Sequence, residues 1–356
     1  MNFEFATAAR IIFGCGKSAE LPSIVHTFGQ RPLLVHRTHA DITLPGAVHF
    51  RVKGEPTIPL VREGAELARR ERCDVVVGFG GGSAIDAAKA IAALLANDGD
   101  PLDYVEVIGK GKPVAKPSVP FIAVPTTAGA GAEVTRNAVL AAPEHRIKVS
   151  MRSPHMLARV ALVDPQLTIG LPPAVTASTG LDALTQLIEP FLSTKANPMT
   201  DAFCREGMRL VARSLRRAFE RGNDLGARTE MSVASLFGGL ALANAGLGAV
   251  HGLAAPIGGM FPSAPHGAVC AALLPHVLEA NARRAPNRDR INEVRSILGD
   301  VAALVRDLQI PGLASYGIRE ADFPAIIEKA QAASSMKANP VILSPDDLRE
   351  VLSAAL

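Results

Sequence analysis

The chain has 356 residues, a length that favours two domains over one, and 48% of its residues are apolar, which is enough for sizeable cores. The formal net charge of +3 is small for this length, and basic residues are interleaved with acidic ones, so no nucleic-acid surface is expected. Tryptophan is absent and tyrosine occurs twice, which also argues against stacking platforms for bases. No apolar run reaches membrane-spanning length without a charge, glycine or proline, so no membrane segment is expected.

Cysteine usage and the N-terminal residues predict a compartment. The four cysteines are widely spaced and form no CxxC pair, which is typical of reduced, mostly buried thiols. The first ten residues, MNFEFATAAR, lack a basic region followed by an apolar one, so no secretory leader is expected. We therefore expect a cytoplasmic protein.

The first half of the chain alternates strand-like and helix-like segments. Alternating apolar and polar residues predict one or two short strands within 1–13, and helical spacing occurs at 61–73 and 84–97. Strand–helix–strand alternation predicts an α/β layer with a parallel sheet. The remaining expected strands are short apolar runs at 32–36, 74–83, 119–127, 148–151 and 159–164.

The pattern changes at about 165–172, after which no segment is a convincing strand. We place a domain boundary there, with an α/β domain at 1–168 and an all-helical domain at 169–356. Helical patterns continue through 200–221, 227–246, 250–260, 267–283, 288–308 and 344–355.

A glycine cluster joins a predicted strand to a predicted helix. It consists of Gly80, Gly81, Gly82 and Ser83. Backbone N–H groups at a helix N-terminus, with no side chains in the way, fit a pyrophosphate. The pattern is neither G-x-G-x-x-G nor a P-loop, and a tight strand-to-helix turn is the alternative. The position between strand and helix favours phosphate binding.

A second loop of small residues, PTTAGAGAEVT at 125–135, also follows a predicted strand. Thr126 and Thr127 can hydrogen-bond a ribose or a phosphate, and the glycines let a ligand approach the backbone. An ordinary loop is the alternative. Lys148 and Asp86 lie near the predicted loops and are further candidates for this site. A surface position or a helix-capping role is the alternative for each.

Arg37 follows the predicted strand at 32–36. An acidic residue at the end of the second strand holds the ribose hydroxyls of NAD, whereas an arginine there can pair with the 2′-phosphate of NADP. This position therefore favours NADP over NAD. A surface arginine without a ligand is the alternative.

Four residues in the second half form a candidate shell for a divalent metal. Asp182 and Gln186 are four apart, so on a helix they share one face, and His251 and His266 follow in VHGLAAPIGGMFPSAPHG. A carboxylate, an amide oxygen and two imidazoles can hold such an ion, although Gln is an uncommon ligand for zinc or iron. Each residue alone is more often structural. His276 is a further potential ligand, with a structural role as its alternative.

Together these segments resemble the iron-containing (group III) alcohol dehydrogenase family over nearly the whole chain. The resemblance implies an N-terminal dinucleotide-binding α/β domain with a parallel sheet and an all-α C-terminal domain, the fold shared with dehydroquinate synthase. It further implies substrate and metal in the cleft between the domains, and a homodimer or higher homo-oligomer. The motifs that carry it are FGCG (13–16), GGGSAIDAAKAIA (80–92), PTTAGAGAEVT, VDPQLT (163–168), GLDALTQLIEP (180–190), VHGLAAPIGG (250–259) and PHGAVCAALLPHV (265–277).

The sequence departs from the family pattern at its metal ligands and elsewhere. The family's ligands are an Asp and a His four apart, then two more His, and Gln186 stands where the family has the first His. Ala255 replaces a histidine thought to relay protons, so a relay must use water, the cofactor ribose or another residue. Arg37 replaces the Asp of NAD-preferring members. The loop AGAGAE replaces the commoner AGTGSE, which removes two hydroxyls near the cofactor.

The resemblance implies an NAD(P)-dependent alcohol dehydrogenase or aldehyde reductase. The nicotinamide half would lie near Thr126, Thr127 and Lys148, and iron or zinc would polarise a small carbonyl substrate. Without a metal, His251 or His266 would stabilise the oxyanion, so both are candidate catalytic residues. The apolar segment 258–264 suggests a small or moderately apolar aldehyde.

Three other functions are compatible with the same fold. A maleylacetate reductase-like enzyme would work without a metal, but its relatives carry Asn at the position of Asp182 and a double His at His251. The cyclisation chemistry of 3-dehydroquinate synthase is opposed by the PHG and GLDALTQ motifs. A degenerate member that only binds nucleotide is the third alternative, to which Gln186 and Ala255 give some weight.

Overall fold

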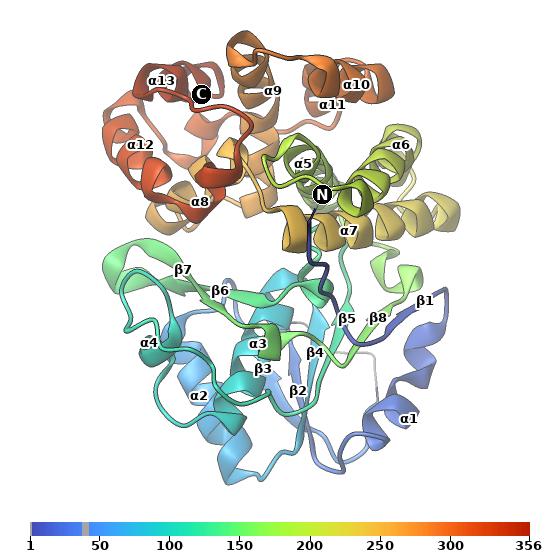
Figure 1. The fold of residues 1–356 in the computed structure, drawn as a ribbon. Coiled ribbons are helices and arrows are strands. Elements are labelled where there is room, and N and C mark those ends of the chain that lie inside the picture. The colour runs from blue at the N-terminus through green and yellow to red at the C-terminus, as the bar shows by residue number, and fades with distance from the viewer. Residues whose placement is uncertain (1, 38–42) are drawn as a thin grey trace. The chain divides into compact units, whose positions relative to one another are not determined.

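The computed structural model describes residues 2–37 and 43–356 (Figure 1), which divide into two compact units. One unit comprises Ala6–Thr127 and Gly131–Thr168, apart from the residues that are not described. The other comprises Ile169–Leu356, together with Ala128–Ala130 and the described N-terminal residues up to Phe5. We refer to them as the sheet unit and the helical unit.

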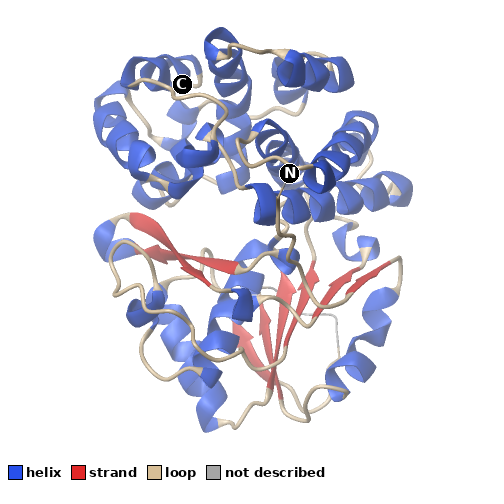
Figure 2. Ribbon diagram, in the orientation of Figure 1, coloured by secondary structure: helices blue, strands red, loops and turns tan. Residues whose placement is uncertain are grey.

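The sheet unit contains a six-stranded sheet in the order β1-β8-β5-β4-β2-β3, in which every neighbouring pair is parallel (Figure 2). This confirms the predicted parallel sheet. All residues of β2, β5 and β8 are buried, as expected for strands covered on both faces. The strands are β1 (Ile11–Phe13), β2 (Pro32–His36), β3 (Val48–Arg51), β4 (Val75–Gly80), β5 (Phe121–Pro125) and β8 (Val160–Val163).

A separate antiparallel ribbon in the same unit is formed by β6 (Asn137–Ala142) and β7 (Ile147–Arg152). The segment expected as a strand at 148–151 lies here rather than in the parallel sheet. Neither β6 nor β3 was expected from the sequence. The ribbon is tied to α3 (Gly82–Ala96) because the carboxylate of Asp86 accepts a hydrogen bond from Val139 N at 3.0 Å.

The helices of the sheet unit begin and end at identifiable residues. The helix expected at 61–73 begins earlier, because the Thr57 side chain caps it by accepting from Leu60 N at 3.2 Å. Helix α3 lies very close to β4, and a Cβ on Gly78 would lie 2.9 Å from Ala88 Cβ. The helices are α1 (Leu21–His26), α2 (Ile58–Arg70), α3 and α4 (Pro101–Tyr104).

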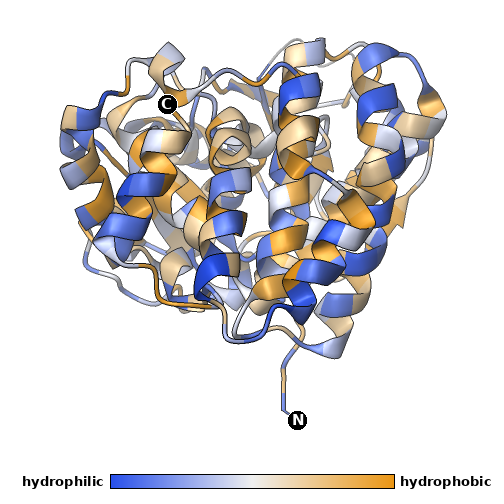
Figure 3. Cartoon of the chain, turned by 90° about the horizontal axis from the view of Figure 1, so that it is seen from above, coloured by the Kyte–Doolittle hydropathy of each residue, from blue (hydrophilic) through white to orange (hydrophobic). Residues whose placement is uncertain are grey.

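Regular structure from 169 to 356, all of which is described, is entirely helical. The helices visible in Figure 3 mix hydrophilic and hydrophobic residues along their length, as amphipathic helices require. Gly299, at φ 69°, separates α10 from α11 within the single helix expected at 288–308, and α12 was not expected. The helices are α5 (Pro173–Leu192), α6 (Pro198–Glu220), α7 (Leu225–Ala245), α8 (Ala249–Met260), α9 (His266–Arg284), α10 (Asp289–Leu298), α11 (Val301–Asp307), α12 (Phe323–Ala332) and α13 (Pro345–Ala354).

Helix α5 is the central helix of this unit and packs against α6, α7 and α9. Every residue from 180 to 192 is buried, including Asp182, Gln186 and Glu189. Buried polar groups cost free energy unless they are satisfied, so these three residues require partners. Among the described residues no single helix is both long and apolar enough to cross a membrane; α7 and α8 qualify only as a pair, bent by 98°.

Candidate functional site

The polar face of α5 is the base of the candidate metal site. Asp182, Gln186 and Glu189 follow at intervals of four and three residues, which places them on one face of the helix. Asp182 Oδ1 and Gln186 Oε1 are both buried and have no hydrogen-bond partner among the described residues. Two such oxygen atoms, on residues one helical turn apart, are donors that a divalent cation can use.

His251 on α8 lies between two carboxylates of α5. Its Nε2 atom is 3.4 Å from Asp182 Oδ1, and its Nδ1 atom is 2.6 Å from Glu189 Oε2. A proton on Nδ1 is therefore donated to Glu189, which leaves Nε2 as the atom available to a ligand. Glu189 was not expected as a site residue, although its spacing of seven from Asp182 places it on the same helical face.

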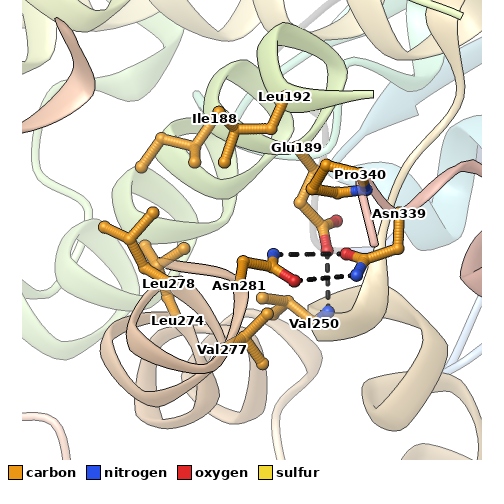
Figure 4. Close-up of a pocket in the computed structure, with 10 residues that line it drawn as sticks. All are labelled: Ile188, Glu189, Leu192, Val250, Leu274, Val277, Leu278, Asn281, Asn339 and Pro340. Atoms are coloured by element: carbon orange, nitrogen blue, oxygen red, sulfur yellow. Dashed lines mark hydrogen bonds between the residues drawn. The ribbon is translucent and has the colours of Figure 1, made fainter. Parts of the chain in front are cut away.

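Side chains from α5, α9 and the loop that contains Asn339 hold the start of α8 in place (Figure 4). Glu189 Oε1 accepts from Val250 N at 2.7 Å, and Asn339 Oδ1 accepts from Ala249 N at 3.1 Å. Asn339 in turn exchanges two hydrogen bonds with Asn281 of α9. A Cβ on Gly248 would lie 2.9 Å from both Asn339 Oδ1 and Glu189 Oε1, so glycine is needed where these side chains approach.

His266 is the first residue of α9, and the glycine after it sets its position. A Cβ on Gly267 would lie 2.3 Å from the backbone oxygen of Ser178, so only glycine lets α9 pack this closely on α5. His266 Nε2 then lies 4.0 Å from Asp182 Oδ1, and its ring centroid is 5.4 Å from that of His251. The His266 side chain is 34% exposed, against 7% for Asp182.

Cys270 is the fourth member of this cluster and was missed as a site residue. It lies one turn after His266 on α9, fully buried, and its Sγ atom is 3.7 Å from His266 Nε2. Asp182, His251, His266 and Cys270 each place one potential ligand atom within 4.8 Å of the others. The spacing of four between His266 and Cys270 is the sequence signal that could have found it.

Burial and neighbouring charges act in opposite directions on this cluster. Burial disfavours the charged form of Asp182, but its interactions with His251 and His266 outweigh burial and hold its pKa below the usual value. Burial likewise opposes protonation of His251, while Cys270, Glu189 and Asp182 raise its pKa well above the usual value. A carboxylate that is ionised when buried is a good partner for a cation.

His276 lies further along α9, ten residues after His266, and is not a member of the cluster. Burial lowers its pKa. A neutral, partly buried imidazole is consistent with a structural role for His276 instead of a role as a metal ligand.

The glycine cluster occupies the carboxyl ends of two adjacent parallel strands. Gly80 ends β4 opposite Pro125 of β5, and its carbonyl accepts from Thr126 N at 2.9 Å. Gly81 is the N-cap of α3, and a Cβ there would lie 3.2 Å from Thr127 Oγ1. The structure therefore brings the segments 80–83 and 126–127 together around the N-terminus of a 15-residue helix. This arrangement fits a phosphate.

Arg37 lies one residue beyond the carboxyl end of β2, the neighbour of β4 in the sheet. Its backbone N lies 4.0 Å from the position that a Cβ on Gly80 would take. Its side chain is exposed, and its carbonyl accepts from Arg51 Nε at 3.2 Å. Arg51, at the end of β3, is a second cation that the sequence analysis did not single out.

Lys148 and Asp86 are held by contacts within the sheet unit. Lys148 lies on β7 of the antiparallel ribbon, and its Nζ atom is 3.1 Å from Glu55 Oε2. Asp86 lies on α3 and accepts the hydrogen bond from Val139 N that ties the ribbon to this helix. A structural role for Asp86 agrees with this contact.

Comparison with known proteins covers almost the whole chain. Residues 8–165 match the family model for iron-containing alcohol dehydrogenase, and residues 176–356 match the model for the C-terminal part of that family. Alcohol dehydrogenase 4 of Schizosaccharomyces pombe is 37% identical over 317 residues, which are 86% of this chain and 74% of that protein. The 1,3-propanediol dehydrogenase of Klebsiella pneumoniae is 38% identical over 312 residues, 83% of this chain and 79% of that protein.

Solved structures of alcohol and aldehyde oxidoreductases are also similar to this chain. A 1,3-propanediol oxidoreductase superposes with a TM-score of 0.92 at 32% identity, covering 100% of both chains. Sulfoacetaldehyde reductase from Bifidobacterium kashiwanohense, solved in complex with NAD+, superposes with a TM-score of 0.89 at 28% identity, covering 100% of this chain and 99% of that one. Sequence and fold agree: the chain belongs to the iron-containing alcohol dehydrogenase family.

Proposed function

We propose that this NAD(P)-dependent alcohol dehydrogenase reduces small aldehydes with NADPH, assisted by a divalent metal ion in the helical unit. The observation that carries the proposal is the buried cluster around Asp182, with two imidazoles beside it and a carboxylate oxygen that no described hydrogen-bond donor satisfies. Relatives named 1,3-propanediol dehydrogenase and 4-hydroxybutyrate dehydrogenase support short-chain alcohols and aldehydes as substrates.

The donor set fits the proposed ion. Asp182 supplies an anionic oxygen, and His251 and His266 supply ring nitrogens, with Gln186 Oε1 as a further oxygen donor. Glu189 keeps a proton of His251 on Nδ1, so Nε2, which lies 3.4 Å from Asp182 Oδ1, is the ring nitrogen that would give up its proton to a bound ion. A bound divalent cation would act as a Lewis acid on the substrate oxygen.

His266 is the cluster member that solvent reaches most easily, since 34% of its side chain is exposed. Ala255 cannot relay a proton, so the proton for the alkoxide has to come from water, the cofactor ribose or another residue. If the ion is absent, a protonated His251 or His266 would stabilise the oxyanion instead.

The sheet unit supplies the nucleotide site. Backbone N–H groups of Gly81, Gly82 and Ser83 at the N-terminus of α3 would hold the pyrophosphate, because helix N-termini attract anions. Thr126 and Thr127 would hydrogen-bond the cofactor from the neighbouring strand end. Lys148, whose Nζ atom pairs with Glu55, would lie toward the nicotinamide half. Exposed Arg37 would pair with the 2′-phosphate of NADP, and Arg51 adds positive charge beside it.

The test is the consumption of NADPH fluorescence on adding a panel of aldehydes, with wild type and His251→Ala. We expect turnover by wild type and its loss in the variant, with NADPH affinity nearly unchanged because His251 lies in the helical unit. His276→Ala, a partly buried histidine of the same unit outside the cluster, should retain turnover. Loss of NADPH affinity in His251→Ala, or full turnover by it, would contradict the assignment.

A metal-independent reductase resembling maleylacetate reductase is the second candidate. Its one supporting observation is Gln186, which replaces an imidazole ligand of the family with a neutral amide. The curated relatives are named as dehydrogenases of alcohols, which favours the first proposal.

A further inference from the structure

We propose that Cys270 is a ligand of the metal ion, so that the site is an Asp182–His251–His266–Cys270 tetrad that prefers zinc to iron. This inference rests on the proposed function in that an ion must bind to the helical unit. The inference goes beyond the proposed function because it assigns the fourth donor to the thiolate of Cys270 instead of the amide of Gln186. No part of the family pattern described above assigns a role to this cysteine.

The distances between donor atoms are those of a four-coordinate site. Zinc with bonds of about 2.0–2.3 Å to N, O and S in tetrahedral geometry places its donor atoms roughly 3.3–3.8 Å apart. The separations here are 3.4 Å from His251 Nε2 to Asp182 Oδ1 and 3.7 Å from Cys270 Sγ to His266 Nε2. The third, from His266 Nε2 to Asp182 Oδ1, is 4.0 Å. Small side-chain movements would complete the shell.

A second observation points independently to a cation among these atoms. Asp182 is buried, with only 5% of the residue exposed, and its Oδ1 atom has no hydrogen-bond partner among the described residues. His251 Nε2 and His266 Nε2 face this oxygen only at 3.4 and 4.0 Å, so coordination to a cation would supply the close partner that it lacks. Cys270 is itself fully buried, so an apolar core thiol is its alternative role.

Cys270 is a stronger donor than Gln186 for a borderline-soft ion. Deprotonation of its thiol on binding releases one proton to solvent and adds a second negative charge to the shell. An amide oxygen is neutral and suits harder ions. Gln186 instead interacts with Asp182 from the next turn of α5, which suits a residue that orients a ligand. The soft sulfur donor is the reason to expect zinc rather than iron.

The test uses the full chain, stripped of metal and reloaded with cobalt(II), which reports its ligands by absorption. Wild type should show a thiolate-to-cobalt charge-transfer band in the near ultraviolet together with visible ligand-field bands. Cys270→Ser should lose the charge-transfer band and bind zinc about 10–100-fold more weakly, whereas Gln186→Ala should keep the band. Cys73→Ser, which removes a buried thiol of the sheet unit, should match wild type in both measurements.

The outcomes separate the two proposals. Stoichiometric cobalt with ligand-field bands but no charge-transfer band in wild type would overturn the role of Cys270 and leave the metal centre standing. A charge-transfer band that persists in Cys270→Ser would likewise overturn it. Wild type that binds no cobalt or zinc would overturn the metal centre itself. The presence or absence of the charge-transfer band in wild type tests Cys270 as a ligand even if the serine variant fails to fold.

Discussion

His251 Nδ1 lies 2.6 Å from Glu189 Oε2, and both residues are buried in the helical unit. The other oxygen of the same carboxylate accepts from Val250 N at the start of α8. One side chain therefore fixes both the orientation of the imidazole ring and the helix that carries it. Charge-assisted hydrogen bonds of this kind are short and strong, and they set which ring nitrogen remains available to a ligand.

Replacing Glu189 with Gln should weaken the metal site while preserving its shape. The amide removes the negative charge that holds the proton on His251 Nδ1, so we expect metal affinity to fall about 10–100-fold, measured by competition with a chelating dye. Glu279→Gln removes an exposed carboxylate that pairs with Arg295, and it should leave the affinity unchanged. Wild-type affinity in Glu189→Gln would show that this contact does not position the ligand.

Replacing Gly81 with Ala should weaken nucleotide binding without disrupting the fold. Gly81 has φ −75°, which alanine tolerates, but the added Cβ would lie 3.2 Å from Thr127 Oγ1, within the proposed phosphate cradle. We expect the Kd for NADPH, measured by fluorescence titration, to rise about tenfold, equivalent to about 1.4 kcal/mol.

The matched control is Gly226→Ala, also at a helix start, where the new Cβ would lie 3.3 Å from Asp224 Oδ1 in the helical unit. Its Kd for NADPH should equal that of wild type. If both variants bind NADPH equally well, the glycine cluster is an ordinary turn.

Arg37→Ala should change the preference between the two cofactors. An arginine that pairs with the 2′-phosphate contributes about 1.5–3 kcal/mol as a charge-assisted bond, so kcat/KM with NADPH should fall by about tenfold or more, while the value with NADH should change little. Arg159→Ala is the control, because this exposed arginine precedes β8 at the opposite, amino end of the parallel strands. Equal losses with both cofactors would contradict a role at the 2′-phosphate.

Glu133, in the loop between β5 and β6, makes the stability of the sheet unit depend on pH. Burial raises its pKa from 4.5 to about 7. Between these values the folded chain keeps a proton that the unfolded chain has lost, so the free energy of unfolding contributed by this group falls as pH rises through that window. Above about pH 7 the loss is complete, at about 3 kcal/mol from 1.36 kcal/mol per pKa unit.

Glu133→Gln has no carboxyl group to titrate, so its unfolding free energy should decline less between pH 5 and pH 8 than that of wild type. Urea unfolding at several pH values measures the difference. Exposed Glu144→Gln should follow the wild-type curve. A wild-type curve and a Glu133→Gln curve that run parallel would show that Glu133 is not buried in its acid form.

The strands that could be predicted from the sequence are those whose run of apolar residues reflects burial on both faces of the sheet. Strands β2, β4 and β5 are continuous apolar runs because both faces of the sheet are covered. Strand β3 was missed because only Phe50 of its four residues is buried. Strand β6 was missed because its buried positions are filled mainly by alanine, which is weakly typical of strands.

The candidate site could be predicted only in part. Asp182, Gln186, His251 and His266 belong to recognisable motifs, whereas Cys270 and Glu189 depend on how α5, α8 and α9 pack together. Gly267 and Gly248 control those approaches, and their importance becomes apparent only when the facing atoms of Ser178 and Glu189 are known. The roles of the site residues stay predictions that the experiments above address, and the domain boundary between residues 168 and 169 stays a prediction.

The most direct test of the account is elemental analysis of protein purified without chelator and again after incubation with zinc or iron(II). We expect a stoichiometric ion that is lost from Asp182→Ala and His266→Ala, with circular dichroism showing that both variants are folded. Retention of zinc by wild type after mixed loading would support the thiolate ligand as well. No ion in wild type under any of these conditions, or an ion retained by both variants, would contradict a metal centre at Asp182.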